Sequence, residues 1–388
     1  MIDWFYDRLP GDEFSIALHQ LRKEGEVVCT TALGGTMPVY YILSHRALAD
    51  AFQDGEQFPP GRAYQIISLP FIGETFMSMD EERHRVWRPP MTASFRRHVI
   101  DQMDEHKLTQ IGHDILDLVE GSTETDLVYS FTRRYAFRVI CNQLGLPIEQ
   151  EAEYYQWSMD VMFGGRDLEK SRVANSALTG MINPILAARR NDPKADQISR
   201  WLLASVGEEE IDETSILSHI RLFFTAGATT TSDAMSNLFH ALLTHPGAWE
   251  QCVAEPEIRP QAIQELLRWN PPVAAQPRFT RPGVAVELAG VEIPANSAVL
   301  FGVAAANRDP TVFPDPDCFD ISRKSKALMT FGPGLRTCPG MHLAQRNLEA
   351  ALRIVADRFP RLRLEQSKAS LPAGILLRGT ASLPVTLR

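Results

Sequence analysis

One segment, residues 331–340, combines a cysteine with the residues that a metal-bound thiolate needs. Cys338 stands near its end, and Arg336 lies two residues before it. Lowering the pKa of a thiol requires nearby positive charge, amide donors or the metal itself. The Gly-Pro-Gly run at 332–334 predicts a tight turn, and Gly340 lets the backbone approach a flat ligand. The segment therefore predicts a metal-binding thiolate in a fixed loop, and the alternative is a buried structural cysteine.

The same segment resembles the haem-binding signature of the cytochrome P450 family, Phe-x-x-Gly-x-Arg/His-x-Cys-x-Gly. The match is complete at Phe331, Gly334, Arg336, Cys338 and Gly340. The resemblance implies that the cofactor is haem b with its iron ligated by Cys338, and that Phe331, Arg336 and Gly340 belong to the cofactor site. A thiolate ligand pushes electron density onto the iron and favours cleavage of the O–O bond.

A second set of residues has the character of an anion site. His84 and Arg88 are four residues apart, so they share one face of any helix there and can address one anion. In the resembling family a His-x-x-x-Arg pair at this place binds a haem propionate, and Arg278 looks like a further propionate ligand. The alternative for the pair is a solvated helix face.

A long helical pattern over residues 212–245 has an unusual middle at 223–231, which includes one Gly and three consecutive Thr. These residues cost roughly 2–3 kcal/mol relative to Ala in a helix interior, so we expect a distorted turn with free hydroxyl groups. The pattern resembles the helix that crosses the distal haem face in P450 proteins. Ala226, Gly227, Thr230 and Thr231 match that pattern.

The same stretch departs from the family at Thr229, where an Asp or Glu usually stands beside the alcohol. Oxygen activation consumes two protons, so the departure concerns proton delivery. Thr230 retains the alcohol, and Thr229 adds a second one. Asp233 lies four residues after Thr229, on nearly the same helix face, and is a candidate replacement for the acid. A water chain through the threonine hydroxyls is the alternative.

Another pair, Glu265 and Arg268, is spaced i and i+3 along a predicted helix. Glu-x-x-Arg carries no information alone. At this distance before the cysteine segment it resembles the structural pair of the P450 family, which anchors the haem-side core.

The elements that position these residues are mainly helical. Apolar residues recur at helical spacing through the middle of the chain and after Gly340, and strand-like runs occur over 26–43 and 280–305. We expect a hairpin in the first run, a short helix over 44–52, a loop over 62–77 and a final hairpin over 371–387. The predicted class is mainly α with a small β portion, which the resemblance implies is the cytochrome P450 fold.

Composition limits the function. The 388 residues contain 44% hydrophobic and 22% charged residues and no linker-like stretch, so we predict one domain over residues 1–388. A net charge of −9 argues against a nucleic-acid partner. The charged N-terminus lacks a long apolar run, which predicts no signal peptide, no membrane anchor and a cytoplasmic location. Five widely spaced cysteines without a Cys-x-x-Cys pair argue against disulfides and zinc.

The resemblance implies a haem-thiolate monooxygenase that oxidises a small apolar substrate with O₂ and electrons from NAD(P)H. The sequence shows no reductase or ferredoxin segment, so we expect a separate ferredoxin or flavodoxin-type donor with its reductase. We also expect a monomer. A peroxide-using or non-oxygenating enzyme, or a haem-binding sensor without turnover, is the alternative. The predicted substrate pocket comprises Phe71, Ile72, Phe76, Phe223, Ala226, Gly227, Val273, Ala274, Ala275, Ile375 and Leu376.

Overall fold

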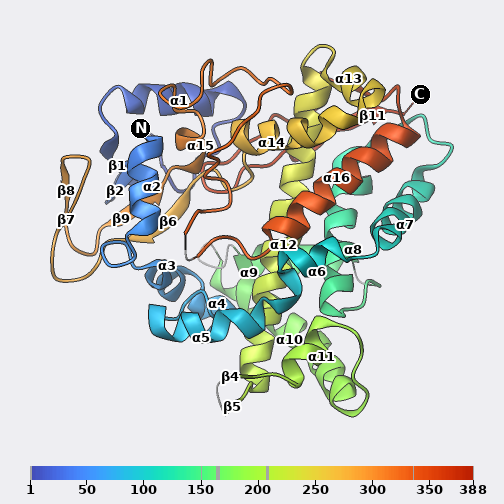
Figure 1. Ribbon diagram of the computed structural model, residues 1–388, viewed down its shortest axis with the longest axis horizontal. Coiled ribbons are helices and arrows are strands. Elements are labelled where there is room, and N and C mark those ends of the chain that lie inside the picture. The colour runs from blue at the N-terminus through green and yellow to red at the C-terminus, as the bar shows by residue number, and fades with distance from the viewer. Residues whose placement is uncertain (1, 150, 163–166, 207–208, 335, 388) are drawn as a thin grey trace.

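The computed structural model describes residues 2–149, 151–162, 167–206, 209–334 and 336–387, and it confirms the predicted class, mainly α with a small β portion (Figure 1). The α-helices in the described residues are α1 (Asp12–Arg22), α2 (His45–Gln53), α3 (Pro60–Ile67), α4 (Leu69–Ile72), α5 (Glu81–Met91), α6 (Arg97–Asp101), α7 (Glu105–Leu116), α8 (Arg133–Leu144), α9 (Glu151–Met162), α10 (Leu168–Asn191), α11 (Gln197–Leu202), α12 (Glu213–Thr244), α13 (Ala248–Ala254), α14 (Arg259–Trp269), α15 (Val303–Ala306) and α16 (Met341–Arg358). The strands are β1 (Val27–Ala32), β2 (Met37–Ile42), β3 (Glu124–Asp126), β4 (Ser205–Val206), β5 (Glu209–Glu210), β6 (Gln276–Phe279), β7 (Val286–Leu288), β8 (Val291–Ile293), β9 (Ala298–Phe301), β10 (Arg363–Leu364) and β11 (Pro384–Thr386).

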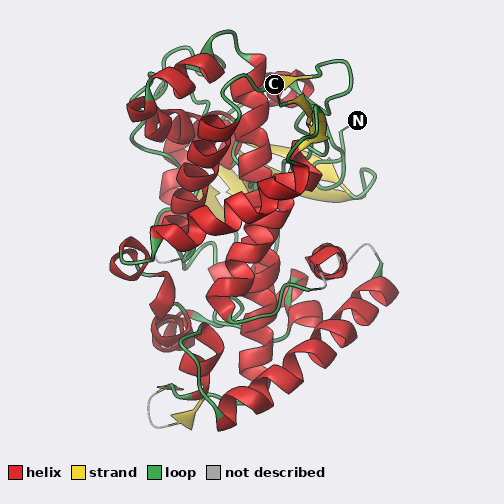
Figure 2. Cartoon of the chain, turned by 90° about the vertical axis from the view of Figure 1, so that its right-hand side faces the viewer, coloured by secondary structure: helices red, strands yellow, loops and turns green. Residues whose placement is uncertain are grey.

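Helix α12 is the axis of the helical part, and Figures 1 and 2 show it running through the middle of the molecule. Its 32 residues correspond to a length of about 48 Å at 1.5 Å per residue. It packs against α8, α9, α14 and α16. Gly227 permits the close approach of α8, because a Cβ atom there would lie 2.9 Å from Cδ1 of Ile140.

The prediction of a distorted turn in this helix is wrong, because α12 is helical without interruption across 223–231. The threonine hydroxyls donate to carbonyl oxygens one turn back. Thr225 donates to Arg221 at 2.8 Å, Thr229 to Thr225 at 2.9 Å and Thr230 to Ala226 at 2.7 Å. These bonds satisfy the hydroxyl groups inside a packed helix, so tertiary burial overrides the low helix propensity of the sequence.

The main sheet joins distant parts of the chain in the order β1-β2-β9-β6. Strands β1 and β2 form the predicted antiparallel hairpin, and the turn between them places Gly34 and Gly35 at positive φ. Strand β9 pairs in parallel with β2 and antiparallel with β6. A smaller sheet has the order β10-β11-β3. The strand signals over 280–305 are confirmed by β7, β8 and β9.

Two local predictions fail where proline and glycine obscure the pattern. The expected loop over 62–77 contains α3 and α4, each with a proline in its first turn, where the missing N–H has no helical partner to lose. The expected final hairpin is also wrong. Residues 373 and 379 form only an isolated bridge, and β11 pairs with β10 and β3 instead. The predicted helix over 44–52 is confirmed as α2, capped by the Ser44 hydroxyl.

The N-terminal segment is tied to the loop over 372–378. The Gly11 N–H donates to the carbonyl of Pro372 at 2.9 Å. The buried Arg378 guanidinium donates to the carbonyls of Leu9 at 3.0 Å and Gly11 at 2.7 Å, and to Oδ1 of Asn270 at 2.9 Å. Across residues 2–387, apart from the gaps given above, no helix has both the length and the apolar character to cross a bilayer.

Candidate active site

The cysteine loop is folded tightly onto itself before α16. Gly332 and Gly334 have φ values of 64° and 108°, which other residues rarely adopt. The Cys338 N–H donates to the Phe331 carbonyl at 2.8 Å, closing the loop. Gly340 then precedes the first residue of α16, and a Cβ atom added there would lie 3.9 Å from Sγ of Cys338, with no other contact within 4 Å from the described residues outside its own chain neighbours and helix. The backbone at Gly340 is therefore open toward the thiol, as a flat ligand would require.

Cys338 and α12 face one cavity of about 280 Å³. The wall contains Cys338 and Gly340 from the cysteine loop and Thr230 from the middle of α12. Removal from bulk water raises the pKa of the Cys338 thiol, while the N–H groups of Gly340 and Met341 and the Arg88 guanidinium act in the opposite direction. The predicted thiol and the predicted alcohol thus share one chamber.

Beside the loop lies a cluster of basic groups with unused donors. Arg88 from α5 donates through Nη2 to the Thr337 carbonyl, but its Nη1 has no hydrogen-bond partner in the described residues. The buried His84 side chain has an unpartnered Nε2, and Arg336 has an unpartnered Nε. Buried polar groups are normally satisfied, so three such atoms around one loop point to a missing acceptor. Carboxylates such as haem propionates match these donors.

The electrostatics of this cluster also favour an anion. Burial, with the nearby Arg336 and Arg88 guanidinium groups, lowers the pKa of His84 to about 3. Burial lowers the pKa values of Arg88, Arg278 and Arg336 as well. Arg278 and Arg336 line one small hollow of about 30 Å³, where the carboxylate of Glu81 lies 3.5 Å from Arg336. Two guanidinium groups therefore border this hollow, and one glutamate offsets part of their charge.

The structure brings together about half of the predicted substrate residues. The cavity wall contains Phe76, Phe223, Ala226, Gly227 and Val273, together with the predicted cofactor residues Phe331, Arg336 and Gly340. The others do not line the cavity: Phe71 and Ile72 pack with the main core, and Ala274, Ala275, Ile375 and Leu376 pack with a second core near the N-terminus. These last four residues come from two segments that pack in one cluster with residues of α1 and β1, so their contact with substrate stays a prediction.

Sequence reasoning missed several polar residues in the wall, among them Tyr64, Gln276 and Asn347. The Gln276 amide donates to the Tyr64 hydroxyl at 3.0 Å, and both side chains line the cavity. Gln276 lies two residues before Arg278 on β6, so the strand period places both on one face and was the signal available. Asn347 from α16 also lines the cavity, with an unpartnered Oδ1. The cavity is mainly apolar with a polar edge.

The three predicted proton-handling residues separate in space. Thr230 lines the cavity, whereas Thr229 is 2% exposed and does not. Asp233 also lies outside the wall, and its carboxylate abuts Gly379, where an added Cβ would lie 2.2 Å from Oδ1. Burial raises the pKa of Asp233 to about 7, while Arg133 and Arg8 act to lower it. Asp233 can therefore hold or release a proton near neutral pH, one turn beyond Thr230.

The Glu265–Arg268 pair is fully buried and bidentate. Nε and Nη2 of Arg268 each donate to a Glu265 oxygen at 2.8 Å. Arg268 also donates to the carbonyls of Asn307, Pro316 and Cys318 at 2.7–3.1 Å. The pair thus anchors the irregular segment over 307–318 to α14, as the resemblance implies.

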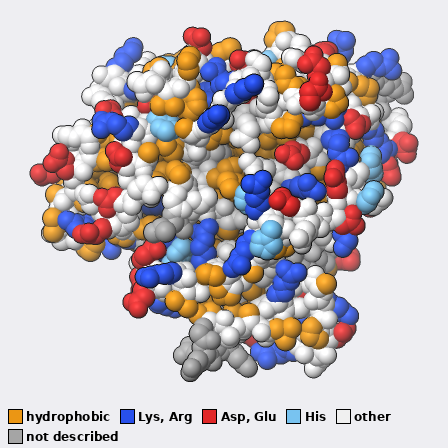
Figure 3. All heavy atoms as spheres, in the orientation of Figure 1, with side chains coloured by type: hydrophobic (Ala, Val, Ile, Leu, Met, Phe, Trp, Pro, Cys, Tyr) orange, Lys and Arg blue, Asp and Glu red, His pale blue; other side chains and the backbone are white. Residues whose placement is uncertain are grey.

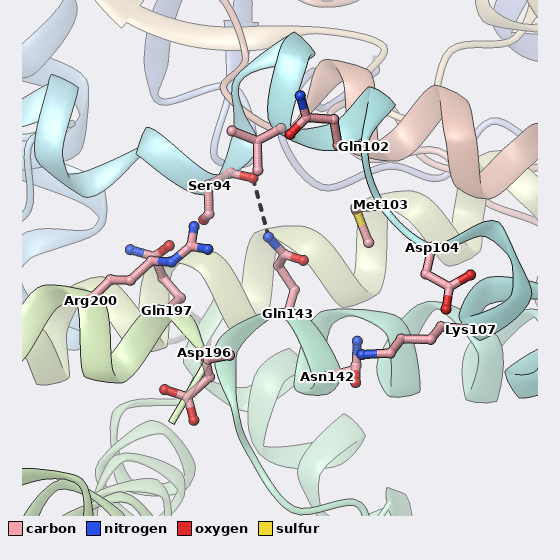
Figure 4. A pocket seen from close by; sticks show the side chains of 12 residues that line it. Ser94, Gln102, Met103, Asp104, Lys107, Asn142, Gln143, Asp196, Gln197 and Arg200 are labelled. Carbon is pink, nitrogen blue, oxygen red and sulfur yellow. Dashed lines mark hydrogen bonds between the residues drawn. The ribbon is translucent and has the colours of Figure 1, made fainter. Parts of the chain in front are cut away.

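A separate polar hollow of about 330 Å³ lies between α7, α8 and α11 (Figure 4). On one wall the Gln143 side chain donates to the Ser94 carbonyl at 3.3 Å. The hollow shares no lining residue with the cavity around Cys338 and contains no residue that the sequence singled out. It is therefore not part of the candidate active site.

Comparison with known proteins agrees with this site. The family model of Cytochrome P450 matches residues 150–376. Cytochrome P450 CYP107DY1 of Priestia megaterium is 33% identical over 313 residues, covering 80% of this chain and 76% of that protein. Vitamin D(3) 25-hydroxylase of Pseudonocardia autotrophica is 31% identical over 80% of this chain and 77% of its own length. A solved structure of a P450 EryK mutant in complex with erythromycin B has a TM-score of 0.85 at 26% identity, covering 98% of both chains.

The matched region spans the cavity-facing helix. The cysteine loop has an open backbone at Gly340, and unpaired donors of Arg336 in the loop and of His84 and Arg88 in α5 lie around it, as a haem would require. Fold, family match and relatives agree with the resemblance found in the motifs. The chain therefore belongs to the cytochrome P450 family, whose cofactor is haem bound through a cysteine thiolate, and it is a monooxygenase.

Proposed function

We propose that this enzyme inserts one oxygen atom of O₂ into a small apolar organic substrate, with Cys338 as the iron ligand. The observation that carries the proposal is the single cavity lined by the Cys338 thiol, the Thr230 alcohol and the apolar side chains of α12. When bound, the haem supplies the redox chemistry that activates oxygen. The protein's own residues bind the cofactor, orient the substrate and deliver protons.

In this proposal, the haem propionates are bound by four basic residues. His84, Arg88 and Arg336 each have a donor without a protein partner, and Arg278 lines the small hollow together with Arg336. Phe331 and Gly340 contribute the cavity wall next to the thiol. Charge-assisted hydrogen bonds to carboxylates are shorter and stronger than neutral ones, so the buried guanidinium groups would contribute much of the cofactor affinity.

Thr230 is proposed to deliver protons at the cavity wall, either from its own hydroxyl group or from a water molecule that this hydroxyl binds. The hydroxyl donates its hydrogen to the Ala226 carbonyl, so its oxygen can still accept a hydrogen bond at the cavity wall. Asp233 is the proposed proton reservoir, since its carboxyl group titrates close to neutral pH. Thr229 would act indirectly, by its bond to Thr225 within the helix.

The proposed substrate is apolar with one polar group. Phe76, Phe223 and Val273 supply flat and branched apolar surface, and the Tyr64–Gln276 pair offers a hydrogen-bonding edge on the same wall. Such pockets use a few placed polar groups to orient a hydrophobic ligand. A relative named for the hydroxylation of vitamin D3 and a structure holding erythromycin B support a hydroxylated polycyclic or macrocyclic compound.

Electrons are proposed to come from NAD(P)H through a ferredoxin or flavodoxin-type donor and its reductase, in the cytoplasm, to a monomeric enzyme. Figure 3 shows Lys, Arg and His side chains gathered over α5 and α6, and Arg85, Arg96, Arg97 and His98 are exposed there. Helix α5 touches the cysteine loop through Arg88. An acidic donor docking on this face would reach the proximal side of the site.

The test is the visible spectrum of the purified protein, reduced under carbon monoxide, followed by titration of the oxidised form with apolar compounds. A thiolate-type Soret band is expected, and Cys338→Ser should abolish it. A histidine-type band, or a Cys338→Ser variant that retains the thiolate band, would refute Cys338 as the ligand. NAD(P)H consumption with surrogate donors then measures turnover.

A peroxide-using enzyme is the second candidate, favoured by one observation. No Asp or Glu side chain is among the described residues that line the cavity. Peroxide already carries the electrons and protons that the O₂ reaction must collect, so it bypasses proton delivery. Product formed with hydrogen peroxide at a rate above that with NAD(P)H and surrogate donors would favour this candidate, whereas the reverse result favours the first. Spectral binding without turnover in either assay would indicate a sensor.

A further inference from the structure

His219 occupies an aromatic box on α12, one turn before Phe223. Its side chain is fully buried. The ring stacks on Trp87 with centroids 6.1 Å apart and on Phe76 at 5.6 Å, and Trp201 lies 6.3 Å away on a tilted plane. The imidazole is therefore held on several sides by rings from different elements.

Hydrogen bonds fix the tautomer of this ring. The Phe76 N–H donates to Nε2 of His219 at 3.1 Å, so Nε2 is an acceptor. Nδ1 lies 2.6 Å from the Ser215 carbonyl, which can only accept, so Nδ1 carries the hydrogen. Burial lowers the pKa of His219 to about 4, which agrees with a neutral ring at physiological pH.

The segment over residues 76–79 binds His219 through the Phe76 N–H, and its carbonyls accept hydrogen bonds from Arg336 of the cysteine loop. Nη1 of Arg336 donates to the carbonyls of Phe76 at 3.0 Å and Met77 at 3.3 Å, and Nη2 donates to Met79 at 3.0 Å. A displacement of the Phe76 peptide therefore changes the acceptors that orient the Arg336 guanidinium.

Phe76 also lies beside His84 and Arg88, the other residues of the basic cluster at the cysteine loop. Its ring centroid lies 6.0 Å from that of His84 and 5.9 Å from the Arg88 guanidinium carbon. The same ring lines the cavity. The position of one residue thus affects three propionate-binding candidates and the cavity wall.

We propose that His219 is a positioning residue: as a neutral imidazole accepting from the Phe76 N–H, it sets the 76–79 segment and thereby the basic cluster that holds the haem propionates. The inference rests on the proposed function, because it takes Arg336, His84 and Arg88 as propionate ligands. His219 lies outside the cavity wall and touches neither thiol nor substrate, so its effect passes through Phe76 and Arg336.

Two matched substitutions test the hydrogen bond. In His219→Gln the amide oxygen can reach the place of Nε2 and accept from Phe76, whereas in His219→Asn the side chain is one methylene too short. His219→Phe keeps the aromatic ring and removes the acceptor. His240→Phe is the control, because His240 is a second buried histidine on α12, and its Nδ1 has no hydrogen-bond partner in the described residues.

The readout is the rate at which holoprotein loses haem to excess apomyoglobin, with the reduction potential measured beside it. We expect haem loss to be at least five-fold faster in His219→Asn and His219→Phe, and within two-fold of the parent in His219→Gln and His240→Phe. In an Arg336→Gln background, His219→Asn should add less than two-fold, since the pathway is already broken.

Equal rates in the Gln and Asn variants, or equal rates in His219→Phe and His240→Phe, would overturn the proposal and leave His219 with a packing role only. If His219→Phe does not fold, the comparison of Gln with Asn still decides. A parent protein without a thiolate Soret band would refute the proposed function instead, so the two failures are distinguishable.

Discussion

Among the described residues, the Glu-x-x-Arg pairs Glu169–Arg172 and Glu265–Arg268 share one bidentate geometry but differ in burial, and they allow a direct test of what burial contributes. In α10, Nε and Nη2 of Arg172 donate to the two oxygens of Glu169 at 3.1 and 2.9 Å, on side chains that are 78% and 69% exposed. In α14, Arg268 binds Glu265 in the same manner with both side chains fully buried. The perturbation is Arg→Met at each site.

Arg268→Met leaves a buried carboxylate that retains only the Asp320 N–H and the Arg323 guanidinium as partners. Removing one partner of a buried ion pair costs about 3–5 kcal/mol. Three backbone carbonyls also lose a donor, at about 1 kcal/mol each. The expected loss is therefore roughly 6–8 kcal/mol. With about 2.1 cal/mol/K of unfolding entropy per residue, this corresponds to a decrease in Tm of roughly 7–10 °C for a chain of this length.

The assay is thermal unfolding of both Met variants, with haem content measured in parallel. Arg172→Met should leave Tm unchanged within error, because water solvates both partners of that pair. The double variant Glu265→Leu/Arg268→Met should be more stable than the sum of the single losses, since no unpaired buried carboxylate remains. A decrease in Tm for Arg268→Met no larger than that for Arg172→Met would refute the argument from burial.

Three further outcomes follow from α12. Thr230→Ala should reduce product formed per NAD(P)H several-fold with little change in substrate binding, and unchanged coupling would exclude a role in proton delivery. Asp233 has a folded pKa of about 7 against 3.8 for the free side chain, so its contribution to stability is greatest below pH ~4 and is lost as pH rises to about 7. Asp233→Asn should remove this loss, so the variant should gain about 1–3 kcal/mol of stability relative to the parent between pH 5 and pH 8, allowing for the partial exposure of the side chain. A difference in Tm between variant and parent that stays constant with pH would contradict the raised pKa. Gly227→Val should clash with Ile140 and cost about 1–3 kcal/mol, and Ile140→Ala should recover part of that stability in thermal unfolding.

The sequence predicted the site best where a residue type has few alternative uses. The sequence indicated Cys338, Gly340 and Arg336 as cofactor-site residues. A thiol, a cation and a glycine that leaves room for a flat ligand rarely occur within ten residues for structural reasons alone. The family was also readable from these positions. Thr230 was predicted from its place in the helix, and it lines the same cavity as Cys338.

The remainder depended on long-range packing that local patterns do not encode. Ala274 and Ile375 are apolar, and Ala274 directly follows Val273 of the cavity wall, yet both pack in a second core with residues of α1 and β1. The expected loop over 62–77 is helical over 62–67 and 69–72, because Pro60 and Pro70 stand in the first turns of α3 and α4 rather than breaking them. Tyr64 therefore reaches the cavity from a helix that the sequence pattern did not reveal.

Arg378 gives the extreme N-terminus an importance that its position in the chain does not suggest. Burial lowers the pKa of this guanidinium to about 9, and carbonyls of residues 9 and 11 supply two of its acceptors. The Arg378 N–H bonds to the Pro272 carbonyl, next to Val273 in the cavity wall. Removing the first dozen residues for expression would therefore take two hydrogen-bond acceptors from the buried Arg378 guanidinium. We expect such a truncation to change substrate selectivity as well as to lower the yield of folded protein.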